Sequence, residues 1–197
     1  MKAIADPFSS RGFGASAPWL DLVNSELWDG FGNFAECLDD RRWVRSFLRF
    51  WKLHIPVGNS EAMADLRELR ALLRHLVESY AAHRSLPSEA VAKLNSWLKV
   101  PVFLELVESR SGFALTLQPA EAGWSSDIAR IARSFADSLL HEARGHLKIC
   151  ANDDCRWTFI DRTKGNVRRW CSDATCGNRD RVRRARAMQS KPRSSGK

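Results

Sequence analysis

The chain lacks the long apolar runs and short catalytic patterns that would place it in several common protein classes. It has no run of the length that a membrane span needs, and residues 1–14 contain no apolar core typical of a secretory signal. G-x-S-x-G, H-E-x-x-H and a phosphate-cradling glycine loop are also missing, and acidic residues form no visible pair. We therefore expect a cytoplasmic protein that is not an enzyme and has no membrane partner.

Cysteine is scarce, with five in 197 residues, yet four of the five form two C-x4-C pairs. These pairs are Cys150 with Cys155 and Cys171 with Cys176. Such pairing indicates a metal site, a disulfide framework or a redox pair. Disulfides need an oxidising compartment, and redox pairs are more often C-x-x-C, whereas structural zinc takes four thiolate or imidazole ligands. We predict that the four cysteines bind zinc and that the fifth, Cys37, is a small buried hydrophobe.

The segment around these cysteines predicts a small treble-clef-like unit. Residues 157–161 and 167–170 are two β-prone runs, and residues 162–166 between them include Gly and Asn, which predicts a hairpin. Residues 178–188 contain no Pro or Gly and favour a helix. The predicted order is a first knuckle, which is the C-x4-C loop of residues 150–155, then the hairpin, a second knuckle at residues 171–176, and the helix. A unit of about forty residues buries too little apolar surface to fold alone, so we expect the metal to close it.

The net charge of +8 is unevenly distributed. Residues 144–197 hold 15 Lys+Arg against 5 Asp+Glu, a net +10, whereas residues 1–143 hold 16 against 18, a net −2. Such asymmetry predicts a polyanionic partner for the C-terminal end, with nucleic acid favoured and a solvated helix without a partner as the alternative. The candidate nucleic-acid contacts are Arg168, Arg169, Asn178, Arg179, Arg181, Arg183, Arg184 and Arg186. Three of them, Arg179, Arg183 and Arg186, share one face of the predicted helix.

The N-terminal region predicts an α+β fold that is mainly helical. Apolar residues recur at helical spacing in several segments, and two β-prone runs around residues 109–112 predict a β-hairpin. The expected helices cover residues 18–31, 37–51, 60–85, 89–97 and 126–145, with Asp29-Gly30 and Gly32-Asn33 breaking the first of them. The expected strands cover residues 101–108 and 112–118. Arg67, Arg70 and Arg74 form a basic stripe in the third helix. We expect this stripe to be a solvated face, with contact to a phosphate backbone as the alternative.

The C-terminal pattern resembles a known family, the CGNR zinc finger. The matching elements are Cys150-x4-Cys155, Phe159 with Asp161, Arg169-Trp-Cys-Ser172, and Cys176-Gly-Asn-Arg179. The resemblance implies zinc as cofactor, the four cysteines as its ligands, and Asn178, Arg179 and Arg181 as signature positions, although the family usually has lysine at position 181. Members usually carry an N-terminal ABATE domain, described as a stress-induced transcription regulator. The Trp-Leu-Asp-Leu-Val-Asn-Ser element at residues 19–25 is similar to a motif near its start.

These observations together predict three parts. Residues 1–143 form an ABATE-like α+β domain, residues 144–190 a CGNR-type zinc finger, and residues 191–197 a basic flexible tail. The predicted function is zinc-dependent nucleic-acid binding, with a DNA-binding transcription regulator favoured. An RNA-binding zinc ribbon and a zinc-stabilised protein-interaction module are the alternatives. A homodimer through the N-terminal domain and a small-molecule effector are partners that the sequence leaves open.

Overall fold

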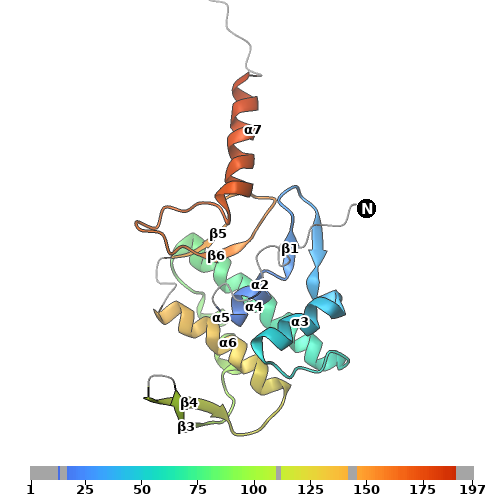
Figure 1. Cartoon of the computed structure of the whole chain (residues 1–197), viewed down its shortest axis with the longest axis vertical. Helices are drawn as coiled ribbons and strands as arrows, with labels where there is room; N and C mark the ends of the chain where they lie inside the picture. The colour runs from blue at the N-terminus through green and yellow to red at the C-terminus, as the bar shows by residue number, and fades with distance from the viewer. Residues whose placement is uncertain (1–12, 14–16, 110–111, 142–145, 190–197) are drawn as a thin grey trace, which may run out of the picture.

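The structure is a computed structural model of the whole chain, and it describes residues 13, 17–109, 112–141 and 146–189. A helical body carries a projecting helix at one end and a β-ribbon at the other (Figure 1). The helices are α2 (Pro18–Val23), α3 (Arg41–Trp51), α4 (Ser60–His83), α5 (Ser88–Trp97), α6 (Trp124–His141) and α7 (Asn178–Gln189), with short helical turns η1 (Cys37–Asp39) and η2 (Asp173–Gly177). The strands are β1 (Glu26–Trp28), β2 (Phe34–Glu36), β3 (Val102–Ser109), β4 (Gly112–Pro119), β5 (Leu147–Ile149) and β6 (Thr158–Ile160).

The strands pair antiparallel as three separate two-stranded sheets, β1 with β2, β3 with β4 and β5 with β6. This mixture of helices and small sheets confirms the predicted α+β class. Gly145, predicted to end α6, and the predicted tail at residues 191–197 lie outside the described residues, as does nearly all of residues 1–16. Within the described part, no helix is both long and apolar enough to cross a membrane.

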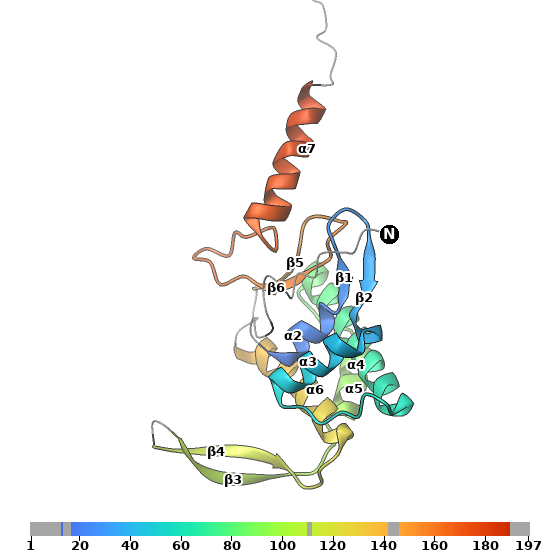
Figure 2. The ribbon, with the colours of Figure 1, turned by 45° about the vertical axis from the view of Figure 1, so that its right-hand side comes forward.

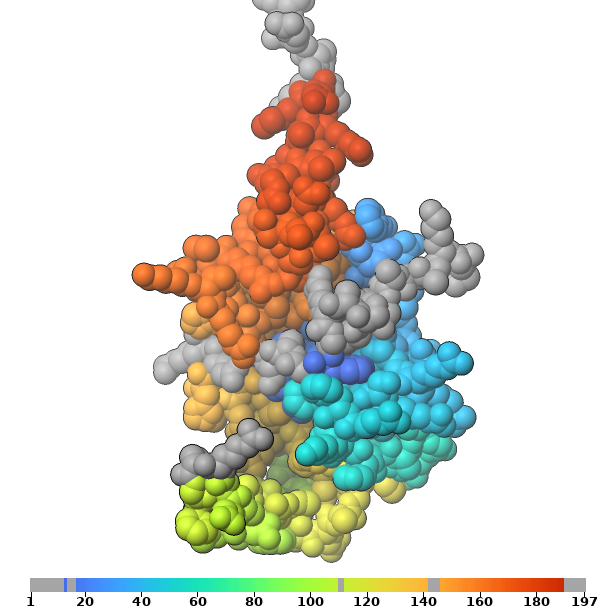
Figure 3. Space-filling model, viewed as in Figure 1, coloured from blue at the N-terminus to red at the C-terminus, as the bar shows by residue number. Residues whose placement is uncertain are grey.

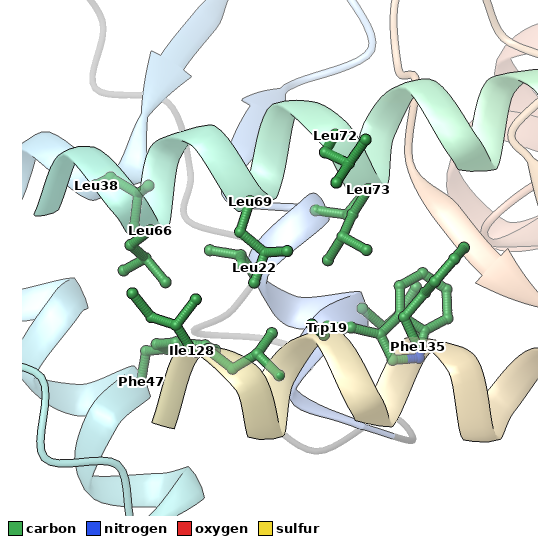
Figure 4. Packing of buried hydrophobic residues seen from close by; sticks show 14 of the residues in the cluster. Trp19, Leu22, Leu38, Phe47, Leu66, Leu69, Leu72, Leu73, Ile128 and Phe135 are labelled. Atoms are coloured by element: carbon green, nitrogen blue, oxygen red, sulfur yellow. The ribbon is translucent and has the colours of Figure 1, made fainter. Parts of the chain in front are cut away.

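The long helix α4 lies at the centre of the hydrophobic core. Leu66, Leu69 and Leu73 point from α4 toward α6, and α2 places Leu22 between the two helices (Figure 4). The Trp19 indole meets the Phe135 ring edge-on at 5.1 Å between centroids, and its Nε1 donates to the Ser138 hydroxyl at 2.8 Å. The fully buried residues here include Trp19, Leu22, Leu66, Leu69, Leu73, Ile128 and Phe135. Because large side chains from three helices meet here, each helix is held by its apolar face.

The helix predicted over residues 18–31 is wrong beyond Val23. Leu27 lies in β1, and Phe31 lies in the connection between β1 and β2. The Asn24 side chain ends the helix because it pairs with the backbone of Thr158 in β6, donating to its carbonyl at 2.9 Å and accepting from its N–H at 2.8 Å. The helical spacing of the apolar residues was therefore overridden by a pairing partner 134 residues away.

The other helices largely match their predicted ranges, with small shifts at their starts. The predicted helix at residues 37–51 divides into η1 and α3, because the Asp40 carboxylate caps α3 by accepting from the Arg42 N–H at 2.8 Å. The cap of α4 is Asn59, which accepts from Ala62 N–H at 3.0 Å. The predicted hairpin is confirmed, with Val102 opposite Pro119 and Ser109 opposite Gly112.

The basic stripe on α4 was expected to be a solvated face or a contact to a phosphate backbone, and neither expectation holds for Arg70 and Arg74. Arg70 and Arg74 are buried. Arg70 places its two terminal nitrogens on the Glu36 carboxylate at 2.5 and 2.6 Å, and Arg74 pairs with Glu26 at 3.4 Å. Only Arg67 lies at the surface, bound to Asp39 at 2.8 Å. Arg70 and Arg74, predicted to be solvated, instead form buried ion pairs that hold β1 and β2 against α4.

The cysteine-rich segment packs directly on the helical body. Leu147 of β5 and Ile160 of β6 belong to the same hydrophobic core as α4. Arg74 also donates to the Arg156 carbonyl and to the Thr158 hydroxyl, both at 3.0 Å, and to the Val23 carbonyl. A shared core and buried hydrogen bonds fix β5 and β6 to the body, and Figure 2 shows them stacked against it.

Replacing Arg74 should show how strongly the two parts depend on each other. We expect Arg74→Met to lower the free energy of unfolding by roughly 3–5 kcal/mol, because it leaves buried carbonyls and Glu26 without their partner. Arg67→Met, on the same helix but at the surface, should cost no more than about 1 kcal/mol. Urea unfolding of both variants measures the difference; equal costs would contradict the bridging role of Arg74.

Candidate metal centre and nucleic-acid interface

The four paired cysteines converge in one buried cluster. The ligand atoms of Cys150, Cys155, Cys171 and Cys176 all lie within 4.8 Å of one another. The sulfur of Cys171 lies 3.6 Å from that of Cys155 and 3.7 Å from that of Cys176. A tetrahedron with Zn–S bonds of about 2.3 Å has sulfur–sulfur edges of roughly 3.8 Å, so the cluster has the dimensions of a four-thiolate zinc site. None of the five cysteines forms a disulfide.

The protonation of the cluster explains why it needs a cation. Hydrogen bonds from Cys155 and Cys171 lower the pKa of Cys150 to about 7, and hydrogen bonds from Cys150 and its neighbours also lower the pKa of Cys176. Hydrogen bonds from Cys150 and the other two cysteines raise the pKa of Cys155, and those from Cys150 and Cys176 raise the pKa of Cys171. Four thiolates this close therefore cannot all ionise without compensation, and a bound Zn²⁺ supplies it. A closed shell of four sulfurs leaves no position for water or substrate, so this zinc site is structural.

Three N–H donors point at the sulfurs. The backbone N–H of Cys171 donates to Cys150 Sγ at 3.4 Å, and Asn152 Nδ2 and Arg179 Nη1 lie 3.7 and 4.0 Å from Cys176 Sγ. Asn178 follows the ligand Cys176 closely in the sequence, but the side-chain amide at the sulfur is that of Asn152, inside the first C-x4-C pair. Asn178 is exposed at the start of α7. The sequence could have suggested Asn152, because it lies between two ligands in the same C-x4-C loop.

The predicted hairpin of residues 157–161 with 167–170 is wrong. The strand β6 pairs with β5, which precedes the first knuckle, and residues 167–170 form no strand. A buried ion pair organises the loop instead: Lys148 Nζ donates to Asp161 Oδ2 at 2.7 Å and to the carbonyls of Asn166 and Arg168 at 2.6 and 2.9 Å. Burial alone would raise the pKa of Asp161, but hydrogen bonds from Lys148, Thr163 and Arg168 hold it well below its usual range.

The two candidate contacts that precede the second knuckle have different roles. Arg168 folds back on the finger: its Nε donates to the Trp170 carbonyl at 2.8 Å, its Nη2 donates to the Cys171 carbonyl, and its guanidinium lies 4.6 Å from the Phe159 ring centroid. Arg169 is exposed and lies over the Trp170 ring at 5.1 Å. Only Arg169 of these two presents its charge at the surface.

The remaining candidates lie on α7, in which no residue is buried. Figure 3 shows the helix as a narrow column standing clear of the body. Its ion pairs are local: Arg181 binds Asp173 at 3.0 Å, and Asp180 binds Arg183 at 3.1 Å and Arg184 at 2.8 Å. Asp180 is the helix's only acidic residue against five arginines, so α7 keeps a net positive charge.

A surface hollow of about 440 Å³ lies at the root of α7. Arg179, Arg183 and Arg186 line it from the helix, as the predicted shared face requires, and Phe31 lines it from the β1–β2 connection. The Arg179 guanidinium lies 3.9 Å from the Phe31 ring centroid and donates to the Asp29 carbonyl at 2.9 Å. Gly30 has φ +80°, a conformation that favours glycine, and a Cβ there would displace the Arg179 guanidinium, whose Nη1 would lie 2.1 Å away.

Phe31 is a site residue that the sequence reasoning missed. It was assigned to the apolar face of a helix, but its ring is 68% exposed beside α7. The signal was present in the sequence, because Phe31 stands between Gly30 and Gly32, and an aromatic residue between glycines is typical of a loop rather than a helix.

Loss of one ligand should release the metal. We expect about one zinc per chain in the wild-type protein and none retained by Cys171→Ser after dialysis against a chelator, because a serine hydroxyl does not replace a thiolate. Cys37→Ser is the matched control: Cys37 is equally buried but lies in the helical core, so this variant should keep its zinc. Elemental analysis with thermal unfolding tests both variants, and a zinc-free wild type would contradict the site.

Comparison with known families agrees with this architecture. The model described as "CGNR zinc finger" matches residues 146–189, and the ABATE model, described as "Putative stress-induced transcription regulator", matches residues 16–142. No curated protein matches the chain. The order of the two matches confirms the resemblance seen in the sequence, and neither description names an enzyme family. Because the ABATE match alone covers more than half of the chain, this protein belongs to the ABATE family, with a CGNR zinc finger following the ABATE domain.

Proposed function

We propose that this protein is a transcription regulator that binds DNA through α7 of its zinc finger. The observation that carries the proposal is the state of α7: it is rooted beside the metal ligand Cys176, projects from the body, buries none of its residues and carries five arginines. Exposed basic helices of this kind are suited to a polyanion. The zinc keeps the root of the helix in place.

The dimensions of α7 suit the major groove. A helix of twelve residues is roughly 18 Å long, and its width of about 10–12 Å with side chains matches a groove about 12 Å wide. Arginines on several sides of the helix can reach phosphates on both walls, and guanidinium forks also match guanine edges. The exposed candidates for these contacts are Arg169, Asn178, Arg181, Arg183, Arg184 and Arg186.

The ion pairs along α7 do not oppose this use. Arg183 and Arg184 share Asp180, and their side chains are more than half exposed. Exposed ion pairs of this kind contribute about 0–1 kcal/mol, so phosphate oxygens can replace Asp180 at little cost. Without nucleic acid, these ion pairs hold the guanidinium groups beside the helix, and a phosphate would replace Asp180 as their partner.

The attachment of the finger supports the same function. The division into residues 1–143 and 144–190 stays a prediction, and we propose that the two parts act as one rigid body. The contacts that support this are the shared core at Leu147 and Ile160 and the buried bonds of Arg74. A signal received by the ABATE domain would then reach α7 without crossing a flexible linker.

Salt dependence and arginine substitutions test the proposal. We expect binding to duplex DNA to weaken steeply between 50 and 200 mM salt, because each phosphate contact releases counterions. Arg183→Ala with Arg186→Ala should weaken binding and reduce the slope of log K against log salt by about 1 for each arginine. Arg133→Ala, an exposed arginine on α6, is the control and should change neither. Fluorescence anisotropy measures all three; salt-independent binding, or none, would overturn the proposal.

An RNA or single-strand target is the second candidate, and Phe31 favours it. An exposed aromatic ring beside Arg179 and the hollow offers a stacking surface for an unpaired base. In duplex DNA the bases are stacked on each other, so their faces are not available to the Phe31 ring. Phe31 therefore distinguishes the two targets.

Removing the ring should affect only single strands. If unpaired bases stack on Phe31, Phe31→Leu should weaken binding to single-stranded RNA or DNA by about 1–3 kcal/mol, because leucine keeps the apolar bulk but has no π face. Phe50→Leu, an exposed aromatic on α3, is the control. Competition between a duplex and a single strand at fixed salt measures the preference. Preference for the duplex together with a silent Phe31→Leu would reject the single-strand target.

A further inference from the structure

The ribbon of β3 and β4 has one strongly apolar face. Paired residues lie on the same side of a sheet, and the register places Leu104 opposite Leu117 and Leu106 opposite Leu115. We define the ribbon face as Val102, Leu104, Leu106, Phe113, Leu115 and Leu117. All six side chains are exposed, from 39% for Leu117 to 76% for Phe113. The one charged residue among the described positions of this side is Glu108, opposite Phe113 near the tip.

Such a ribbon is unusual in isolation. Two-stranded sheets are marginally stable in water unless a third strand or another layer covers them. Within the described residues β3 and β4 pair only with each other, and both outer edges are open. Figures 1 and 2 agree that the ribbon extends from the end of the body opposite α7. Its apolar face therefore lies far from α7, and a partner that covers this face would be distinct from a nucleic acid bound at α7.

We propose that the ribbon face is a dimer interface, covered by the ribbon face of a second copy of this chain. The six side chains expose on the order of 600 Å² of apolar surface, which approaches the roughly 800 Å² per partner of a standard interface. Two-fold symmetry brings the same face onto itself, and a face of aliphatic and aromatic side chains, with Glu108 only near the tip, is complementary to itself without charge pairing. The area and the charge pattern both fit a second copy.

The surroundings of the ribbon face disfavour other occupants. The charged side chains described on the ribbon, Glu105 and Glu108, are acidic, so the described strands offer no attraction to an anionic membrane or to nucleic acid. A partner recognised through charge would need complementary groups, and the six residues of the ribbon face carry none.

The face continues onto the body at its base. A hollow of about 260 Å³ lies between the ribbon and α6, and its lining combines Val102, Leu117 and Ala129 with Arg130 and Arg133 of α6. Two facing sheets pack about 10 Å apart, so a second ribbon would lie over this hollow as well as over the exposed leucines. The resulting dimer would leave each α7 exposed at an outer end. The interface therefore needs no nucleic acid and stands independently of the function proposed above.

Neighbouring residues on opposite faces allow a matched test. Sedimentation of the full zinc-loaded chain over a range of concentrations should show a dimer. Leu104→Glu should weaken association by at least about 100-fold, because burying an unpaired carboxylate costs several kcal/mol. Phe103→Glu is the control: Phe103 is 52% exposed on the same strand but points to the other side. It introduces the same charge and should leave the dimer unchanged.

Each outcome decides the proposal. A dimer that Leu104→Glu dissociates and Phe103→Glu does not would support it. A wild-type monomer at all concentrations would overturn it and leave the face to a foreign partner. Equal effects of the two variants, or a dimer that neither affects, would also overturn it. Circular dichroism and zinc content confirm that each variant is folded, and the double variant Leu106→Glu with Leu115→Glu repeats the test if Leu104→Glu does not fold.

Discussion

Four thiolates held within 4.8 Å repel one another, and the compensation of that repulsion by zinc is the interaction on which the finger depends. Once the cation is bound, each cysteine pair fixes a different element. Cys150 and Cys155 hold the β5–β6 hairpin, and Cys171 and Cys176 hold η2 and the first turn of α7. The helix that carries four of the five exposed arginines among the candidate nucleic-acid contacts therefore takes its direction from the metal.

The metal site and the helical body stabilise each other. Asn152 donates both to the sulfur of Cys176 and, at 3.2 Å, to the Gly30 carbonyl in the β1–β2 connection. Arg179 likewise reaches Cys176 and the Asp29 carbonyl. The N-terminal domain thus supplies part of the shell around a zinc site in the C-terminal segment. The ABATE domain and the finger therefore meet at Asn152 and Arg179, the two side chains that also lie against the ligand Cys176.

Arginine has two distinct uses in this chain, and burial separates them. Arg74 and Arg168 direct their donors at backbone carbonyls and join segments that would otherwise leave those carbonyls unpaired. Arg183 and Arg184 share one exposed carboxylate and remain available to another anion. The total positive charge therefore overstates the surface open to a polyanion, because part of it is committed to contacts inside the fold.

The sequence by itself determined the features that near neighbours encode. The spacing of the four cysteines predicted the zinc site, the run without Pro or Gly predicted α7, and the turn residues around Gly112 predicted the β3–β4 ribbon. Only the tertiary structure decided that β6 pairs with β5, that Arg70 and Arg74 are buried, and that Phe31 lies beside α7. The last two depend on partners far along the chain, such as Thr158 for Arg74 and Arg179 for Phe31. Local periodicity carries no information about such partners, because burial and pairing arise only when distant segments meet.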